Sequence, residues 1–141
     1  DDGRLCSGGA DLTIKIWNLE RRKCEKELIG HKSWIRSLYQ LKNGILLSSD
    51  NKSLLIWHNL SLFKSINCHC EYRNFCQIDD NCLAGATFDN VIDLLDLNNY
   101  QKYKVLTGHF SNVICIIKLK DNKLASCSLD KTIKIWEQQL L

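Results

Sequence analysis

The chain has 141 residues, of which 45% are hydrophobic and 25% are charged, and its formal net charge is +3. This composition is typical of a globular domain and excludes a disordered chain. The net charge is too small to indicate a phosphate-binding surface, and no apolar run approaches the roughly 18 residues that cross a bilayer. We therefore expect no nucleic-acid partner and no membrane segment.

Eight cysteines are a high number for this length. The opening residues do not resemble a signal peptide, so we expect reduced thiols in an intracellular compartment, cytoplasmic or nuclear. Cys6, Cys115 and Cys127 stand among apolar strand residues, where a thiol packs as a small hydrophobic group. Methionine is absent from the chain, and we expect it to be a segment of a longer protein.

Short predicted strands begin close to the N-terminal end. Strands are expected over Arg4–Ser7 and Thr13–Trp17, with an aspartate in the turn between them, because Asp tolerates turn geometry and bonds to nearby backbone. In the second strand the two isoleucines face one way and the Trp faces the other, so we expect it to be buried on both faces. A further strand over Cys24–Ile29 ends before Gly30-His31.

The middle of the chain repeats this order. Strands are expected over Ile35–Leu41, Ile45–Ser49 and Ser53–Trp57, and then over Asn90–Leu95 and Lys102–Leu106. These runs contain apolar residues and are bounded by turn residues, which favours strands.

The last group of strands covers Val113–Leu119, Leu124–Ser128 and Lys131–Trp136. Like the earlier groups, it places a strand that ends in a Trp after a turn that contains Asp. Each group is therefore interpreted as one unit of four short strands.

The Trp-bearing strands recur at a regular interval. Their anchor positions are Trp17, Trp57, Leu95 and Trp136, and successive anchors are 40, 38 and 41 residues apart. A fixed period of this length is typical of a repeat protein in which each repeat forms one supersecondary unit.

Polar residues keep the same phase. Asp11, Asp89 and Asp130 lie six residues before their anchors, and Asn51, which follows Asp50, lies six before Trp57. Two Gly-His pairs each place a histidine 14 residues after an anchor. Several kinds of residue that recur at the same distances from the anchor positions are hard to produce by chance.

This pattern resembles the WD-repeat β-propeller family, whose repeats of about 40–45 residues form four-stranded blades with a Gly-His … Trp-Asp pattern. The resemblance covers essentially the whole chain. It implies an all-β fold of four-stranded antiparallel blades in an incomplete ring of about three and a half blades. The remaining blades are expected from the parent chain or by association. The units are roughly 1–30, 31–67, 68–108 and 109–141.

The sequence departs from the family pattern at two kinds of position. The residue after each Trp is Asn18, His58 or Glu137, never Asp. The third unit has Leu95 in place of Trp and Asn67-Cys68 in place of Gly-His. We expect the third blade to be less rigid than the others.

The resemblance implies that the polar marks form a structural hydrogen-bond framework. In the fourth unit His109 would bond to a buried Asp130, and Ser126 or Ser128 would link the His to the Trp136 indole, because buried polar groups must be paired. A Ser-His-Asp hydrolase is the alternative, but the chain has no Gly-x-Ser-x-Gly elbow, and we expect no catalytic residue. Across the units the expected framework residues are Asp11, Trp17, His31, Ser49, Trp57, Asp89, His109, Ser126, Ser128, Asp130 and Trp136.

In this family the narrow face, formed by the loops around Gly-His and the Asp turn, is the usual docking site. Aromatic residues and Arg are enriched in binding hot spots, and Trp34 beside Arg36 and Arg73 suits an acidic or phosphorylated peptide. The alternative is that Trp34 and Phe88 pack into neighbouring blades. By position, the expected face residues are Trp34, Arg36, Asp50, Glu71, Arg73, Phe88, Asn112, Ile114 and Leu129.

One cysteine cluster resembles a metal site, formed by Cys68, Cys70, Cys76 and Cys82. Zinc sites usually use Cys-x₂₋₄-Cys pairs, whereas here one residue separates the first two cysteines and five separate each later pair. The repeat phase puts Cys76 and Cys82 on different strands. We therefore expect no metal and no cofactor.

These observations favour a non-enzymatic protein–protein interaction module or scaffold that presents peptide-binding loops on a rigid propeller. Within the same class, the alternative is the substrate-recognition arm of a ubiquitin ligase. A metal-binding or catalytic propeller belongs to a different class, which the missing site residues disfavour.

Overall fold

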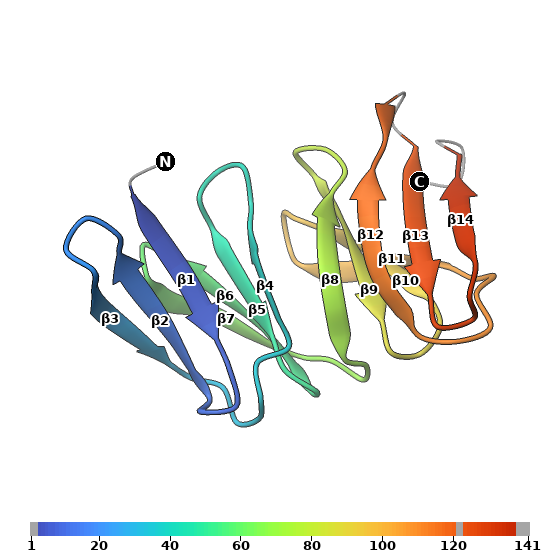
Figure 1. Cartoon of the computed structure of the whole chain (residues 1–141). Coiled ribbons are helices and arrows are strands. Elements are labelled where there is room, and N and C mark those ends of the chain that lie inside the picture. The colour runs from blue at the N-terminus through green and yellow to red at the C-terminus, as the bar shows by residue number, and fades with distance from the viewer. Residues whose placement is uncertain (1–2, 121–122, 138–141) are drawn as a thin grey trace. The chain divides into compact units, whose positions relative to one another are not determined.

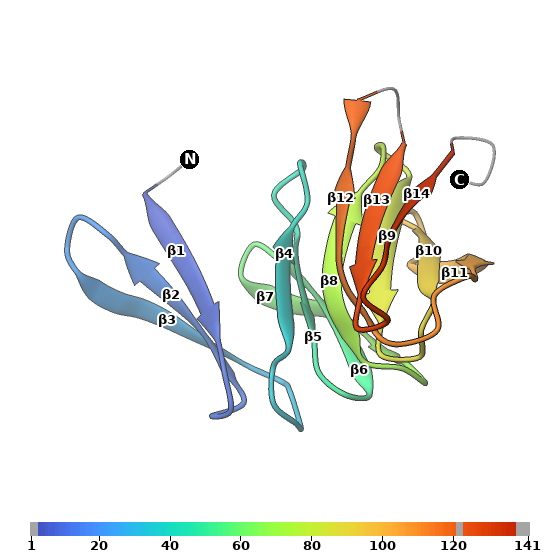
Figure 2. The ribbon, with the colours of Figure 1, turned by 45° about the vertical axis from the view of Figure 1, so that its right-hand side comes forward.

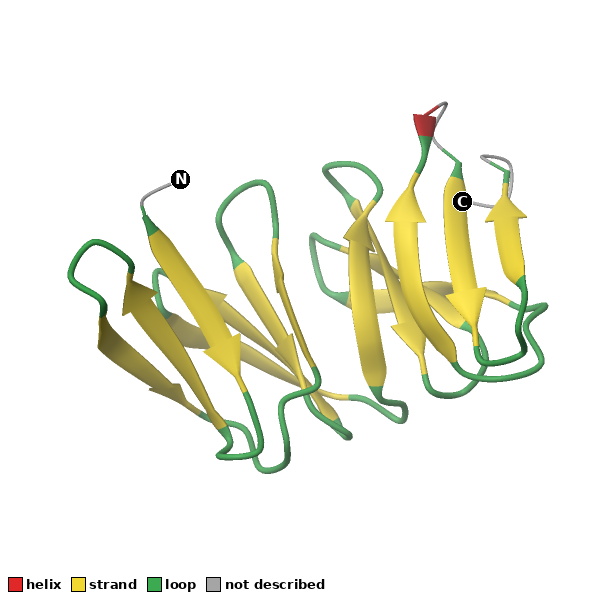
Figure 3. Ribbon diagram, in the orientation of Figure 1, coloured by secondary structure: helices red, strands yellow, loops and turns green. Residues whose placement is uncertain are grey.

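The sequence folds into short strands joined by loops and tight turns (Figure 3). A computed structural model describes residues 3–120 and 123–137, and the ends of the first and last expected units, together with residues 121–122, lie outside the described residues. The described part contains fourteen strands, paired antiparallel in four sheets, which confirms the predicted all-β fold (Figure 1). It includes no helix with the length and apolarity that crossing a bilayer requires.

The chain divides into two compact units, Asp1–His69 and Cys70–Leu141, and each unit contains two sheets. In the first unit, β1-β2-β3 form one sheet and β4-β5-β6-β7 form the other. The strands are β1 (Arg4–Gly8), β2 (Thr13–Asn18), β3 (Lys23–Ile29), β4 (Ser37–Gln40), β5 (Leu46–Ser49), β6 (Ser53–His58) and β7 (Ser61–Asn67).

The core of the first unit joins its two sheets. Ile14 and Ile16 of β2 belong to one buried cluster with Leu55 and Trp57 of β6. Strand β6 is buried on both faces, whereas Trp17 in β2 is only half-buried. The expectation that both faces of β2 are buried is therefore wrong, because within the described part of this unit the second sheet covers only the isoleucine face.

In the second unit the sheets have the orders β8-β9-β10-β11 and β12-β13-β14, and they lie side by side in both views (Figure 1, Figure 2). The strands are β8 (Tyr72–Gln77), β9 (Cys82–Thr87), β10 (Ile92–Asp96), β11 (Gln101–Leu106), β12 (Val113–Lys118), β13 (Leu124–Ser128) and β14 (Ile133–Trp136).

Side chains from both sheets form the core of the second unit. Ile92 and Leu94 of β10 share a buried cluster with Val113, Ile116 and Trp136 of the neighbouring sheet. The apolar residues of each strand alternate toward this cluster, as the period of two along a strand requires. A Trp at the anchor position thus packs against the preceding sheet.

The predicted strand over Ile35–Leu41 shortens to β4, and its first residue bonds outside its own sheet. The Ile35 N–H donates to Gly9 O of the other sheet at 3.1 Å. A Cβ on Gly8 would lie 2.7 Å from Ile35 Cγ2, so Gly8 permits this close approach. Ile35 therefore links the two sheets of the first unit.

Candidate partner-binding surface

A hydrogen-bond chain crosses the last sheet from the loop before β12 to the end of β14. His109 Nδ1 lies 2.7 Å from Asp130 Oδ2, and His109 Nε2 lies 2.8 Å from Ser126 Oγ. The Trp136 indole N–H donates to the same Ser126 hydroxyl at 2.8 Å. All of these polar groups are thus paired inside the protein, as buried polar groups must be.

Asp130 accepts several further hydrogen bonds. Burial by itself would raise the pKa of Asp130, but bonds from the Thr132 side chain, the Phe110 N–H and His109 outweigh it, and the pKa lies well below its usual value. The carboxylate is therefore a stable negative charge that ties the loop before β12 to the turn between β13 and β14.

The second sheet contains the same chain with different residues from those expected. His31 Nδ1 lies 2.8 Å from Asp50 Oδ2, and His31 Nε2 lies 2.6 Å from Ser48 Oγ. The Trp57 indole N–H donates to Ser48 Oγ at 2.7 Å. Two predictions need correction: the serine of this framework is Ser48 and not Ser49, and Asp50 is a framework residue and not part of the docking face.

The length of the turn explains this shift of register. Asp50 N–H donates to Ser53 O, so two residues close the turn, whereas Ser128 N–H donates to Thr132 O around three residues. Counted back from the Trp, the bridging Ser of the second unit is therefore one residue closer than in the fourth, nine residues against ten, while its Asp is one residue farther, seven against six. Asp50 is 2% exposed, which excludes it from any docking face.

The first sheet has part of this arrangement. The Trp17 indole N–H donates to Ser7 Oγ at 2.8 Å. Asp11 is exposed and accepts a hydrogen bond from Lys15 Nζ at 2.8 Å, which together with the Thr13 N–H lowers the pKa of Asp11. In this sheet the partner of the Asp is thus a lysine, and among the described residues no hydrogen bond links Asp11 to Ser7.

The third sheet replaces the framework with a different cluster. Asp89 is exposed, so its predicted framework role is wrong, and no histidine occupies the matching position. The buried carboxylate here is Asp93, whose Oδ2 accepts from the Tyr72 hydroxyl at 2.9 Å and lies 3.3 Å from Lys102 Nζ. Cys70 Sγ also contacts this oxygen at 3.6 Å.

Gly85 explains why Tyr72 reaches Asp93. Gly85 stands ten residues before Leu95, as Ser126 stands before Trp136, so the third unit lacks both the serine and the indole. A Cβ on Gly85 would lie 2.6 Å from Tyr72 Cε1, and the phenol ring fills the space over this glycine. The sequence signals for this cluster were Gly85 at the position of the framework serine and Asp93 two residues before Leu95, which replaces the Trp.

Ser128 has a role different from that of Ser126. Its hydroxyl donates to Ser111 O at 2.8 Å and accepts from the Asp130 N–H at 3.0 Å. Ser128 therefore supports the turn, and of the two serines left open by the sequence only Ser126 bridges His109 and Trp136.

Five of the nine expected face residues meet in the second unit. Together with buried Val113 they line one hollow at the end of the sheets that carries the Asp turns, which we call the Asp-turn end. Phe88, Ile114 and Leu129 are 45%, 44% and 58% exposed, so they do not pack into the core. The six lining residues are Arg73, Phe88, Asn112, Val113, Ile114 and Leu129.

Arg73 gives this hollow its charge. Arg73 Nε lies 2.8 Å from Glu71 Oε1, and Arg73 Cζ lies 5.2 Å from the centre of the Phe88 ring. The guanidinium is thus held by an ion pair and a cation–π contact. Since a guanidinium carries five N–H donors, one ion pair does not use all of them.

The first unit carries a similar pair at its own Asp-turn end. Trp34 is 55% exposed, and Arg36 Cζ lies 5.2 Å from the centre of its ring. Trp34 therefore lies on the surface of this unit, as the docking interpretation requires, and does not fill its core.

The four cysteines of the metal-like cluster belong to different elements and make different contacts. Cys76 is in β8 and Cys82 begins β9, while Cys70 contacts Asp93 and the Cys68 thiol donates to Ile66 O. Within residues 3–120 and 123–137, no group of three or more His, Cys, Asp or Glu side chains is placed to hold a metal ion.

Comparison with known proteins gives one consistent family. The family model "WD domain, G-beta repeat" matches residues 22–58 and 100–137. In structure, the chain is similar to the WD40 beta propeller domain of Doa1, with a TM-score of 0.83 and 24% identity over 99% of this chain and 48% of that one.

Curated relatives match nearly the whole chain. Apoptotic protease-activating factor 1 of Rattus norvegicus is 27% identical over 94% of this chain, and E3 ubiquitin-protein ligase COP1 of Arabidopsis thaliana is 25% identical over 97%. Ribosome biogenesis protein YTM1 of Candida glabrata is 25% identical over 96%. The chain spans only 11%, 22% and 26% of these three proteins.

Proposed function

The chain belongs to the WD-repeat family, described as "WD domain, G-beta repeat", and from this membership we propose that it is a non-enzymatic module that binds protein or peptide partners at the Asp-turn end of its sheets. The observation that carries the proposal is the hollow in the second unit, where exposed apolar residues surround one guanidinium. Exposed loops on a rigid scaffold are the usual place for binding residues.

The hydrogen-bond framework supports this role by fixing the loops. His109 and Asp130 join the loop before β12 to the turn after β13, and the hollow is lined by residues beside both segments. A surface whose loops are already ordered loses less entropy when it binds. The framework residues thus serve binding indirectly, through the positions of Ile114 and Leu129.

The chemistry of the hollow indicates the partner. Phe88, Ile114 and Leu129 offer an apolar surface, and Arg73 offers a positive edge. We propose a peptide with an apolar side chain followed by an acidic or phosphorylated residue, because a guanidinium binds carboxylates and phosphates in a planar fork.

The position of Ser126 supports a function without catalysis. The Ser126 side chain is 2% exposed, and its hydroxyl is engaged by both His109 and Trp136. A nucleophile must reach its substrate, so this Ser-His-Asp grouping is better suited to hold the sheet together.

A peptide-display selection on the full chain tests the proposal. We expect enrichment of peptides with an aliphatic or aromatic residue next to Asp, Glu or a phosphoresidue, and loss of capture in Arg73→Ala. Arg21→Ala is the matched control, since Arg21 is exposed in the turn at the opposite end of the first unit. Selected peptides that bind Arg73→Ala and Phe88→Ala as well as the original chain would contradict the proposed surface.

A second candidate is the substrate-recognition arm of a ubiquitin ligase. The similarity to E3 ubiquitin-protein ligase COP1, of which the chain covers 22%, favours it. The test is ubiquitin transfer to a captured partner by the full-length parent protein. Loss of ubiquitin transfer in the Arg73→Ala variant would support the ligase role. Capture of the partner without ubiquitin transfer would support the interaction module instead.

We also propose an intracellular location, cytoplasmic or nuclear. None of the eight cysteines forms a disulfide in the described part of the chain, which suits a reducing compartment. Fractionation of cells that express the tagged parent protein tests this proposal, and recovery from the secreted fraction would oppose it.

A further inference from the structure

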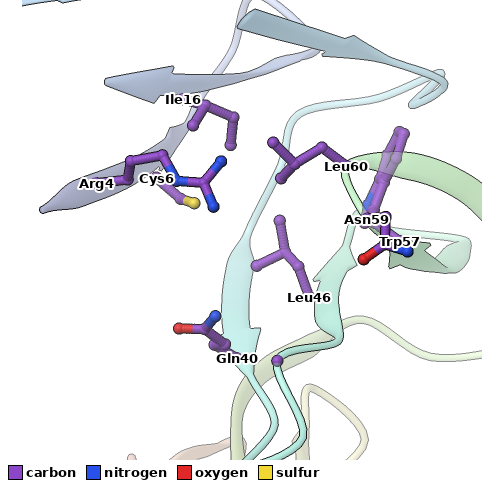
Figure 4. A pocket seen from close by; sticks show the side chains of 9 residues that line it. Arg4, Cys6, Ile16, Gln40, Leu46, Trp57, Asn59 and Leu60 are labelled. Atoms are coloured by element: carbon purple, nitrogen blue, oxygen red, sulfur yellow. The ribbon is translucent and has the colours of Figure 1, made fainter. Parts of the chain in front are cut away.

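The first unit contains a hollow at the end of its sheets opposite the Asp turns (Figure 4). Its volume is about 150 Å³, and it is separate from the surface proposed above. A cavity of similar volume with aliphatic and aromatic walls holds a molecule the size of benzene, so one amino-acid side chain is the expected scale of a ligand. The lining residues are Arg4, Cys6, Ile16, Gln40, Gly44, Leu46, Trp57, Asn59 and Leu60.

The inner wall of the hollow is apolar. Ile16, Leu46 and Trp57 are 1%, 6% and 3% exposed and belong to the buried cluster between the two sheets. Cys6 and Leu60 are partly buried and pack against this cluster. An apolar ligand group in the hollow would therefore extend an existing core and lose contact with water.

The rim of the hollow is polar and positively charged. Arg4 reaches from β1 toward Leu46 and Leu60, while Gln40 and Asn59 lie at the ends of other strands (Figure 4). Among the described lining residues, Arg4 is the one charged side chain. A guanidinium with neighbouring amides favours a carboxylate, which accepts several hydrogen bonds at once.

The turn that supplies part of this wall is strained. Asn59 and Leu60 connect β6 to β7 with φ angles of 50° and 57°. Asn tolerates this left-handed conformation, but Leu rarely adopts it. Asn-Gly is the usual pair in such a hairpin turn. The turn therefore contains a Leu in an unfavourable backbone conformation, and this Leu closes one side of the hollow.

From the apolar wall, the guanidinium and the strained turn together, we propose that this hollow binds the C-terminal residue of a peptide that ends in Leu, Ile or Val. In a C-terminal residue, one Cα carries both an aliphatic side chain and a carboxylate. This matches a hollow of one-residue size with an apolar wall and Arg4 at its rim. An internal Asp or Glu carries its charge on the side chain and leaves the apolar wall unfilled.

The test uses the peptide Gly-Ser-Gly-Ser-Leu with a free carboxylate, and the same peptide with a C-terminal amide, titrated into the full chain. The Trp57 indole N–H resonance reports binding, since Trp57 lines the hollow. We expect the free-acid peptide to shift the Trp57 indole N–H resonance in a saturable way. The amide peptide should bind with an affinity at least about tenfold lower, because a charge-assisted hydrogen bond is lost. Equal binding of acid and amide, or no shift of Trp57, overturns the proposal.

Two variants complete the experiment. Arg4→Gln should weaken the binding of the free acid to the level of the amide, and Arg21→Gln, which changes another exposed arginine, should not. Leu60→Gly removes the side wall and relieves the turn, so it should weaken the acid and the amide alike, and thermal unfolding checks that the variant is still folded. The Arg73→Ala variant should still bind the free-acid peptide in this hollow. This outcome separates the present proposal from the proposed function, which depends on Arg73 at the Asp-turn end.

Discussion

His31 and Asp50 hold each other inside the first unit, with Nδ1 and Oδ2 2.8 Å apart and both side chains nearly inaccessible to water. Asp50 also accepts the N–H groups of Lys52 and Ser53, so one carboxylate joins the loop before β4 to the turn after β5. This contact explains why a residue that the sequence placed on the docking face is essential to the fold instead.

The first prediction concerns this pair. Asp50→Ala should lower the free energy of unfolding by about 3–5 kcal/mol, because it leaves His31 buried without its acceptor and releases the turn. Asn51→Ala should change it by less than about 0.5 kcal/mol, since Asn51 is exposed. Urea unfolding of both variants measures the difference. Equal costs would mean that the pair contributes little beyond the turn itself.

The second prediction concerns acid stability. The Asp50 and Asp130 pKa values are lowered because hydrogen bonds outweigh burial, so their stabilisation is complete above the unfolded-state pKa of about 3.9. It is lost as the pH falls through the lower folded-state values. The urea midpoint should therefore hold from pH 7 to about 5 and then fall below about 4.

Variants identify the groups responsible for this acid loss. Asp130→Asn should have a lower midpoint at pH 7 and a smaller further loss on acidification. Asp80→Asn is the control, because Asp80 is exposed and its replacement should leave the profile unchanged. A profile of Asp130→Asn parallel to that of the original chain would assign the acid loss to other groups.

The third prediction concerns Gly85. Gly85→Ala should cost about 1–3 kcal/mol, because the added Cβ would lie 2.6 Å from the Tyr72 ring, which has no room to move away. Gly9→Ala is the control, since its Cβ would meet Asp11 at an ordinary 3.6 Å. Thermal unfolding measures both. If the double variant Gly85→Ala/Tyr72→Val is as unstable as Gly85→Ala alone, the clash with Tyr72 is not the cause.

The fourth prediction concerns the exposed pair of the first unit. Replacing Trp34 and Arg36 with Ala should abolish capture of partners that bind this unit and leave the melting temperature within about 2 °C, because Trp34 is 55% exposed. Pull-down from the same lysate and thermal unfolding check the two statements. A large loss of stability would assign Trp34 to packing.

The sequence by itself determined the repeat, the strand order and, in the fourth unit, the framework residues His109, Asp130 and Trp136. These follow from local periodicity and from a fixed spacing between Trp136, His109 and Asp130, which a strand geometry of constant rise preserves. Because each holds a regular position in its unit, the sequence also grouped Arg73, Phe88, Asn112, Ile114 and Leu129, which line one hollow in the structure, and their role in binding stays a proposal.

Only the tertiary structure decided the details that break the register. A turn shorter by one residue and an Asp at a different place in that turn put the framework on Ser48 and Asp50, and a count back from Trp57 detects neither change. The cluster of Tyr72 with Asp93 replaced the missing histidine, because a glycine left room that a distant ring fills. Such exchanges depend on volume and distance across strands, and these exist only once the sheet has formed.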